Sequence, residues 1–286
     1  MSRRPATGPF RLLALDIDGT LLRSDKTISP RTRTALAVAR ERRVHLVLVT
    51  GRRYPSARKV AEDLGLAGPL VLHNGALIVS GVPHDDGGVL RCRPLAREVA
   101  LEAAAIGRRC GADPVLHCGQ RGEGRLLAHA GPLSSTLMAY YLDRSHPDVV
   151  SCVAFEDALT EDPLQVMFGG RLEEMAALVP ELRAALRGRA KVERTVYPAQ
   201  GTALLDVLEP SVGKAEALAF LQERWGVAAA ETLAIGDNWN DQEMLTRAGL
   251  GLVMGNADPE MRALGLPVLP TADEDGVAVA IERYVL

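Results

Sequence analysis

Residues 12–20 read Leu-Leu-Ala-Leu-Asp-Ile-Asp-Gly-Thr, which is the pattern of a buried strand that ends in a polar cluster. Residues 44–52 (Val-His-Leu-Val-Leu-Val-Thr-Gly-Arg) and residues 69–75 (Pro-Leu-Val-Leu-His-Asn-Gly) have the same form. Helical patterns at residues 30–43 and 55–64 separate the three runs. This β-α-β-α-β order of apolar strands predicts a parallel sheet buried between helices on both faces. Ligands of such sheets bind at the carboxyl ends of the strands, where the polar clusters lie.

The rest of the chain indicates an insertion. Residues 83–207 mix short strand patterns with helical ones, which is typical of a separate α+β module. After Pro210 the alternation of helices and buried strands returns. We therefore expect an α/β fold in which a doubly wound parallel sheet core, residues 1–82 and 208–286, is interrupted by an inserted α+β cap domain, residues 83–207.

The composition excludes several classes of protein. The 286 residues carry a net charge of −3 with a pI near 6.1. This argues against a nucleic-acid binder, because such proteins usually have a strongly basic balance or face. The sequence contains no run of 18 apolar residues that could form a membrane span, and residues 1–9 lack the apolar stretch of a signal peptide. We expect a cytoplasmic protein with neither nucleic acid nor membrane as a partner.

Acidic residues follow two of the predicted strands. Asp16 and Asp18 follow the first, and residues 236–241 (Gly-Asp-Asn-Trp-Asn-Asp) follow a strand predicted at 232–235. Taken alone, each cluster also fits a solvated turn or a helix cap. At one edge of one sheet their carboxylates would converge, and two carboxylates about 4 Å apart repel by about 4 kcal/mol at an effective dielectric of about 20. Mg²⁺, which prefers oxygen ligands, would offset that repulsion.

Four motifs, taken together and in this order, resemble those of the haloacid dehalogenase-like phosphohydrolase superfamily. They are Asp16-Ile-Asp18-Gly-Thr20, Thr50, Lys214 and Gly236-Asp237-x-x-Asn240-Asp241. The large insertion lies between the second and third motifs, which is similar to the class IIB cap of the Cof-type sugar-phosphate phosphatases. Residues 73–76, 253–257 and 273–277 are also Cof-like. The sequence departs from the family at residues 211–215, Ser-Val-Gly-Lys-Ala in place of the usual Gly-Val-Ser-Lys-Gly, where the lysine is kept.

The resemblance implies a Rossmann-like core and a role for each motif residue. Asp16 would be the nucleophile and Asp18 the general acid and base. The metal ligands would be Asp16, Asp18 through its backbone carbonyl, Asp237 and Asp241. The phosphate would be bound by Thr50, Lys214 and Asn240. Arg52 and Asn74 lie at the mouth of the same cleft and would contact the leaving group, although Arg52 could equally pair with an acid of the core.

The two catalytic aspartates need opposite protonation states in the first step. An ordinary aspartate, with a pKa of about 3.9, is almost fully ionised at neutral pH. We therefore predict a raised pKa for Asp18 and a low one for Asp16, which the bound metal would hold low, since such splitting assigns the roles of acid and nucleophile.

The resulting hypothesis is a Mg²⁺-dependent phosphatase that hydrolyses phosphate monoesters of small metabolites through an aspartyl-phosphate intermediate. A phosphomutase of the phosphomannomutase type remains an alternative, because its cap is similarly placed. A non-catalytic phosphometabolite-binding protein is the alternative from another class. The sequence specifies neither the substrate nor the oligomeric state.

Overall fold

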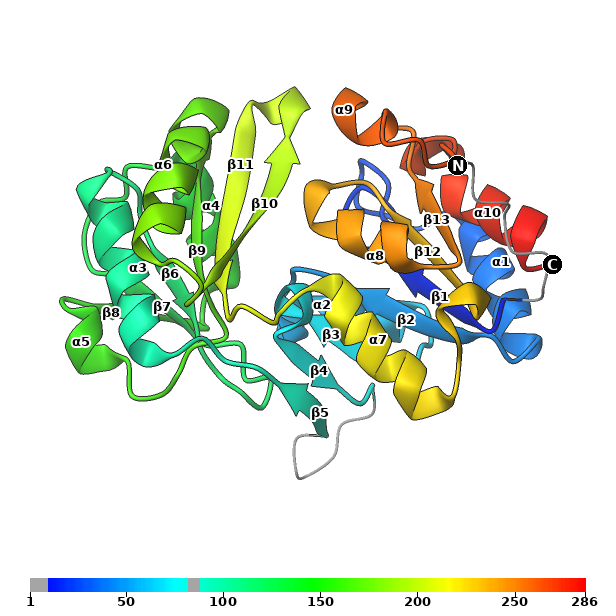
Figure 1. Ribbon diagram of the computed structural model, residues 1–286, viewed down its shortest axis with the longest axis horizontal. Helices are drawn as coiled ribbons and strands as arrows, with labels where there is room; N and C mark the ends of the chain where they lie inside the picture. Colours follow the sequence, from blue (N-terminus) through cyan, green and yellow to red (C-terminus); the bar gives the residue numbers. More distant parts are fainter. Residues whose placement is uncertain (1–9, 82–87) are drawn as a thin grey trace.

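The computed structural model describes residues 10–81 and 88–286, and over these residues the strands form two sheets in two lobes (Figure 1). The first sheet has the order β13-β12-β1-β2-β3-β4-β5. Its strands are β1 (Leu12–Leu15), β2 (His45–Val49), β3 (Leu70–Leu72), β4 (Leu77–Val79), β5 (Val89–Cys92), β12 (Thr232–Gly236) and β13 (Leu250–Val253). The strands from β13 to β3 are parallel, whereas β4 and β5 extend the sheet in antiparallel pairs. We call this lobe the core.

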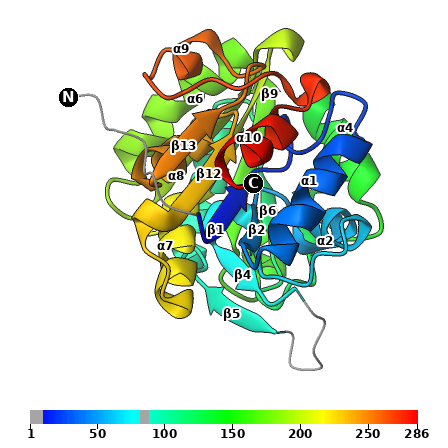
Figure 2. The same cartoon turned by 90° about the vertical axis from the view of Figure 1, so that its right-hand side faces the viewer.

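Helices cover both faces of the core sheet, because alternate residues of its strands bury opposite faces. Leu13 and Leu15 pack against α1, α2 and α10, while Leu12 and Ala14 pack against α7, α8 and α9. Figure 2 shows the two groups of helices on opposite sides of the strands. The helices are α1 (Pro30–Glu41), α2 (Tyr54–Asp63), α7 (Lys214–Trp225), α8 (Gln242–Arg247), α9 (Pro259–Arg262) and α10 (Gly276–Tyr284). The predicted doubly wound α/β core is confirmed.

The second lobe, which we call the cap, is built on a sheet of order β10-β11-β9-β6-β7-β8. Its strands are β6 (Val115–His117), β7 (Leu126–His129), β8 (Val149–Cys152), β9 (Gln165–Arg171), β10 (Lys191–Tyr197) and β11 (Thr202–Leu208). Its helices are α3 (Arg97–Arg109), α4 (Thr136–Ser145), α5 (Phe155–Ala158) and α6 (Leu172–Ala185). Helices α3 and α6 bury one face of this sheet, and α4 packs on the other through Met138.

The strand β5 lies in the core sheet, where Cys92 pairs with Leu77 of β4. From the sequence these residues were expected to belong to the insertion, because a short strand that is only partly buried and contains Arg91 has no buried-strand pattern. We therefore propose that the cap begins after Cys92 rather than at residue 83.

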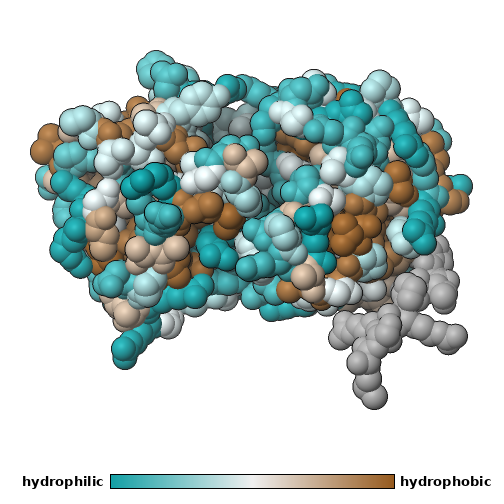
Figure 3. Space-filling model, turned by 90° about the horizontal axis from the view of Figure 1, so that it is seen from above, coloured by the Kyte–Doolittle hydropathy of each residue, from teal (hydrophilic) through white to brown (hydrophobic). Residues whose placement is uncertain are grey.

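The two lobes face each other across a hollow, which Figure 3 shows from above with mainly hydrophilic side chains at its border. In the described part of the chain, no helix combines the length and the apolar character that a membrane crossing requires.

Candidate active site

Four neighbouring strands bring the candidate residues to one edge of the core sheet. The strand order β12-β1-β2-β3 places Asp237, Asp16, Thr50 and Asn74 side by side, each just after the carboxyl end of its strand. Lys214 is the first residue of α7 and points at the same edge. The parallel strands therefore bring together residues that lie more than two hundred positions apart in the sequence, such as Asp16 and Asp237.

A compact acidic centre surrounds the Lys214 ammonium group. Asp16, Asp237 and Asp241 each offer a carboxylate oxygen within 4.8 Å of the others. Lys214 Nζ donates to Asp16 Oδ1 and to Asp241 Oδ1, both at 2.6 Å. Because Lys214, Asp16 and Asp241 are all buried, water screens these charges weakly. One lysine thus faces three carboxylates, which leaves an excess of negative charge.

The pKa values of Asp16 and Asp237 are raised in this buried, negatively charged environment. Burial raises the pKa of Asp16 to about 7, with Asp241 adding to the rise and Lys214 opposing it. Desolvation, together with Asp16 and Asp241, raises the pKa of Asp237 well above its usual range. Burial would lower the pKa of Lys214, but Asp16 and Asp241 raise it above its ordinary value, so the ammonium group stays charged.

The acidic centre fits a divalent cation, with Asp16 and Asp237 as its best-placed ligands. Asp237 Oδ1 accepts one hydrogen bond, at 3.0 Å from Thr20 Oγ1. Gly19 has a φ of +78°, and a Cβ there would lie 2.3 Å from Asp237 Oδ2, so the backbone forms a close-fitting wall. Carboxylate oxygens are the ligands that Mg²⁺ prefers, and a cation would offset the negative charge.

Asp241 has a different environment from the other two acids. Its Oδ1 binds Lys214, and its Oδ2 accepts from the backbone N–H groups of Asp237 and Asn238, both at 3.1 Å. Protein groups therefore already occupy both of its oxygens. In this structure Asp241 holds the ammonium group and the loop after β12 in place, and it has less free capacity for a metal than Asp16 or Asp237.

Asp18 is paired with Arg52. Arg52 Nε lies 2.6 Å from Asp18 Oδ2 and Nη2 lies 2.7 Å from Oδ1, and Lys26 Nζ lies 3.6 Å from Oδ1. Burial alone would raise the pKa of Asp18, but the hydrogen bonds and charge of Arg52, with Lys26, hold it below its ordinary value. The lowered pKa of Asp18 is opposite to the direction predicted from the sequence, whereas the low pKa predicted for Asp16 refers to the metal-bound carboxylate. The pairing of Arg52 with an acid of the core was one of the two alternatives left open from the sequence, but the pKa prediction did not take it into account.

The three predicted phosphate ligands lie around the acidic centre. The buried Thr50 hydroxyl accepts from the backbone N–H of Arg52 at 3.1 Å, which leaves its own hydrogen free to donate. Asn240 Nδ2 donates to Asn74 Oδ1 at 2.9 Å. Asn74 in turn donates to Asp206 of the cap at 2.9 Å, so its side chain is engaged by protein groups.

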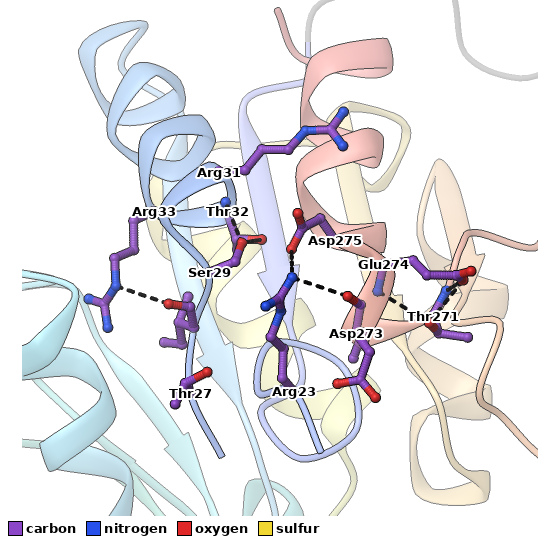
Figure 4. A network of polar contacts seen from close by, with 12 residues as sticks. Arg23, Thr27, Ser29, Arg31, Thr32, Arg33, Thr271, Asp273, Glu274 and Asp275 are labelled. Atoms are coloured by element: carbon purple, nitrogen blue, oxygen red, sulfur yellow. Dashed lines mark hydrogen bonds and ion pairs between the residues drawn. The ribbon is translucent and has the colours of Figure 1, made fainter. Parts of the chain in front are cut away.

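The Cof-like segments near the C-terminus anchor the loop that follows Asp16 and Asp18. Asn256 Nδ2 donates to the Gly19 carbonyl at 2.7 Å, and its Oδ1 accepts from the backbone of Ala272 at 2.9 Å. Arg23 bonds to the backbone carbonyl of Asp273 and to the Asp275 carboxylate, as Figure 4 shows. These contacts fix the position of the loop and thus of Gly19 against Asp237.

The cap contributes residues that no sequence motif indicated. Asp206 and Gln165 lie on β11 and β9, are buried, and extend the hydrogen bonds of Asn74 into the cap. Asn238 of the core binds both backbone groups of Val196 on β10. The only sequence signal for Asp206 was a carboxylate within the apolar strand 202–208.

The family assignment rests on sequence and on structure. Residues 13–281 match the family model of the haloacid dehalogenase-like hydrolases. The chain is 31% identical over 281 residues to a protein of Serratia proteamaculans (strain 568) named HMP-PP phosphatase, covering 96% of each chain. It is 27% identical over 286 residues to the 5-amino-6-(5-phospho-D-ribitylamino)uracil phosphatase YitU of Bacillus subtilis (strain 168), covering 97% of this chain and 98% of YitU.

Its fold is also similar to that of a solved structure, a haloacid dehalogenase subclass IIB sugar phosphatase. The TM-score is 0.77 at 24% identity, over 96% of this chain and 98% of the other. Together with the four motifs and their convergence at one edge of the sheet, these matches confirm the resemblance seen in the sequence. The chain belongs to the haloacid dehalogenase-like hydrolases.

Proposed function

We propose that this chain is a Mg²⁺-dependent phosphatase that hydrolyses small phosphorylated metabolites through a phosphoaspartate on Asp16. The observation that carries the proposal is the acidic centre, in which Lys214 Nζ lies 2.6 Å from Asp16 while Asp16 and Asp237 keep oxygens for a cation. A phosphate dianion is repelled by carboxylates, and this arrangement supplies positive charge where the phosphoryl group would bind.

Asp16, Asp237 and the backbone carbonyl of Asp18 would hold the Mg²⁺ ion. When bound, Mg²⁺ neutralises phosphoryl oxygens and makes phosphorus more accessible to a negatively charged nucleophile. Lys214, the Thr50 hydroxyl and the Asn240 amide would bind the remaining phosphoryl oxygens. Asp241 would keep Lys214 oriented through its 2.6 Å hydrogen bond.

The proposed reaction has two steps. A carboxylate oxygen of Asp16 attacks phosphorus, the bond from phosphorus to the ester oxygen breaks, and Asp18 gives that oxygen its proton. In the second step Asp18 takes a proton from water, the water oxygen attacks the phosphoaspartate, and inorganic phosphate leaves with Asp16 restored. Asp18 can act as the donor only if Arg52 releases it, and Arg52 would then be free to contact the leaving group.

The cap would select the leaving group. A cavity of about 330 Å³ lies between the lobes, and Lys214 and Asn240 of the core and Lys191 and Glu193 of the cap are among its lining residues. This volume suits a metabolite and is too small for a macromolecule. The names of the two relatives describe small phosphorylated compounds, and we infer a substrate of similar size for this chain.

The test is phosphate release from a panel of phosphorylated metabolites, with Mg²⁺ or with a chelator. We expect release only with Mg²⁺, without any bisphosphate activator, and a loss of about a thousandfold or more in Asp16→Asn. Asp157→Asn, which removes an exposed cap carboxylate, is the matched control and should retain full activity. Activity that survives in Asp16→Asn would remove the nucleophile, a need for a bisphosphate would indicate a mutase, and no turnover of any ester would indicate a binding protein.

A further inference from the structure

A relay of hydrogen bonds runs from the interior of the cap to the proposed phosphate site. Gln165 Nε2 donates to Asp206 Oδ1 at 2.9 Å, and Asn74 Nδ2 donates to Asp206 Oδ2 at 2.9 Å. Asn240 Nδ2 then donates to Asn74 Oδ1, again at 2.9 Å. Gln165, Asp206 and Asn74 are buried, so water cannot easily replace any of these bonds.

The relay has a fixed direction. An ionised carboxylate only accepts hydrogen bonds, so both amides that face Asp206 must present N–H groups. Asn74 therefore turns its oxygen toward Asn240, and Asn240 must donate an N–H to that oxygen. The second hydrogen on Asn240 Nδ2 remains available for a phosphoryl oxygen. Asn74 has little freedom to move, because its backbone N–H donates to the Thr50 carbonyl at 3.0 Å.

We propose that Asp206 of the cap is a positioning residue for the phosphate site, which orients the Asn240 amide through Asn74. The inference rests on the proposed function, since it takes Asn240 as a phosphate ligand. Its consequence is that the phosphate site is complete only while β11 of the cap is docked on the core. Binding of the phosphoryl group and closure of the cap would then favour each other.

A second contact between the cap and the core serves as a control, because it allows the proposed role of Asp206 to be distinguished from a general role in docking the cap. Arg53 of the core lies 3.0 Å from Asp148 of the cap, and this pair is not a member of the hydrogen-bond relay. Asp206→Asn keeps the size of the side chain but allows it to donate, so the relay loses its direction. Asp148→Asn makes the same chemical change at a cap–core contact outside the relay.

The experiment measures inorganic phosphate binding by calorimetry with Mg²⁺, and kcat/KM on an ester hydrolysed by the wild type. Burial and the charge of Glu193 raise the pKa of Asp206 to about 7, while the hydrogen bond from Asn74 opposes this rise. Both quantities are therefore measured at about pH 8.5, where Asp206 is ionised. We expect Asp206→Asn to weaken phosphate binding and kcat/KM about tenfold, and Asp148→Asn to change them less than about twofold. In an Asn240→Ala background, Asp206→Asn should have no further effect, because a coupled pair is not additive.

Wild-type phosphate affinity in Asp206→Asn, or an undiminished effect of that change in the Asn240→Ala background, would overturn the inference. If Asp206→Asn does not fold, Gln165→Met removes one donor to Asp206, and the same cycle with Asn240→Ala applies. An inactive wild type would contradict the proposed function instead, while the binding measurement would still decide the relay.

Discussion

Arg52 holds Asp18 by both carboxylate oxygens, with nitrogen–oxygen distances of 2.6 and 2.7 Å. Such two-point pairs are among the stronger ionic contacts, and this one is only partly exposed, with side-chain exposures of 24% and 31%. It keeps Asp18 ionised, whereas the proposed first step needs a proton on that residue. The pair therefore describes a state before leaving-group protonation, and its opening would be a step toward reaction.

Replacing Arg52 should raise the pKa of Asp18. In Arg52→Met, burial is no longer opposed by the guanidinium, so we expect the basic limb of the kcat/KM pH profile, where the protonated acid is lost, to move to higher pH. Arg52→Lys keeps the charge without the two-point geometry and should shift the limb less. A limb that stays in place in Arg52→Met would show that Asp18 is not the group that titrates there.

The acidic centre should make the metal-free protein less stable as the pH rises. Asp16 has a folded-state pKa of about 7 against an ordinary value of 3.8, so the folded state holds more protons than the unfolded state between those values. Stability then falls as the pH rises through this window.

Asp237→Asn should relieve this repulsion while it removes a metal ligand. The asparagine oxygen can still accept the bond from Thr20. In chelator at pH 8 we expect the unfolding temperature to rise by about 2–4 °C, and the stabilisation by Mg²⁺ to disappear. Asp157→Asn serves as the control. A variant that Mg²⁺ stabilises as strongly as the wild type would exclude Asp237 as a ligand.

Two glycines with the same backbone angle allow a test of how closely the backbone at Gly19 approaches Asp237. Gly19 and Gly111 both have φ of +78°, but a Cβ at Gly19 would lie 2.3 Å from Asp237 Oδ2, whereas no described atom lies within 4 Å at Gly111. Each alanine variant should lose about 1 kcal/mol of stability from backbone strain. Only Gly19→Ala should also lose Mg²⁺-dependent activity, as phosphate-release assays would measure. Equal activity in the two variants would contradict the close approach at Asp237.

The core could be predicted from the sequence because its strands are buried and end in polar clusters, so that Asp16, Thr50 and Asp237 had to meet at one edge. The cap could be predicted only in outline. Helix α4 was not predicted, because Met138 and Ser145 are its only buried residues and its sequence therefore shows no helical repeat of buried apolar residues. The pairing of Arg52 with Asp18 depends on side-chain directions that the pattern does not contain.

The cap is joined to the core at an edge strand. β10 is the outer strand of its sheet, and Asn238 covers its free backbone groups: Oδ1 accepts from Val196 N at 2.9 Å, and Nδ2 donates to Val196 O at 2.8 Å. Asn238→Ala removes both bonds, so we expect amide hydrogen exchange at Val196 to become about tenfold faster.

Exchange in β9, at the centre of the cap sheet, should stay unchanged in Asn238→Ala, because that strand is paired on both sides. This strand is the internal control, since faster exchange in both strands would mean that the whole cap has lost stability. Unchanged exchange at Val196 would mean that Asn238 does not hold β10. Faster exchange in β10 alone would identify Asn238 as a contact that keeps this edge of the cap on the core.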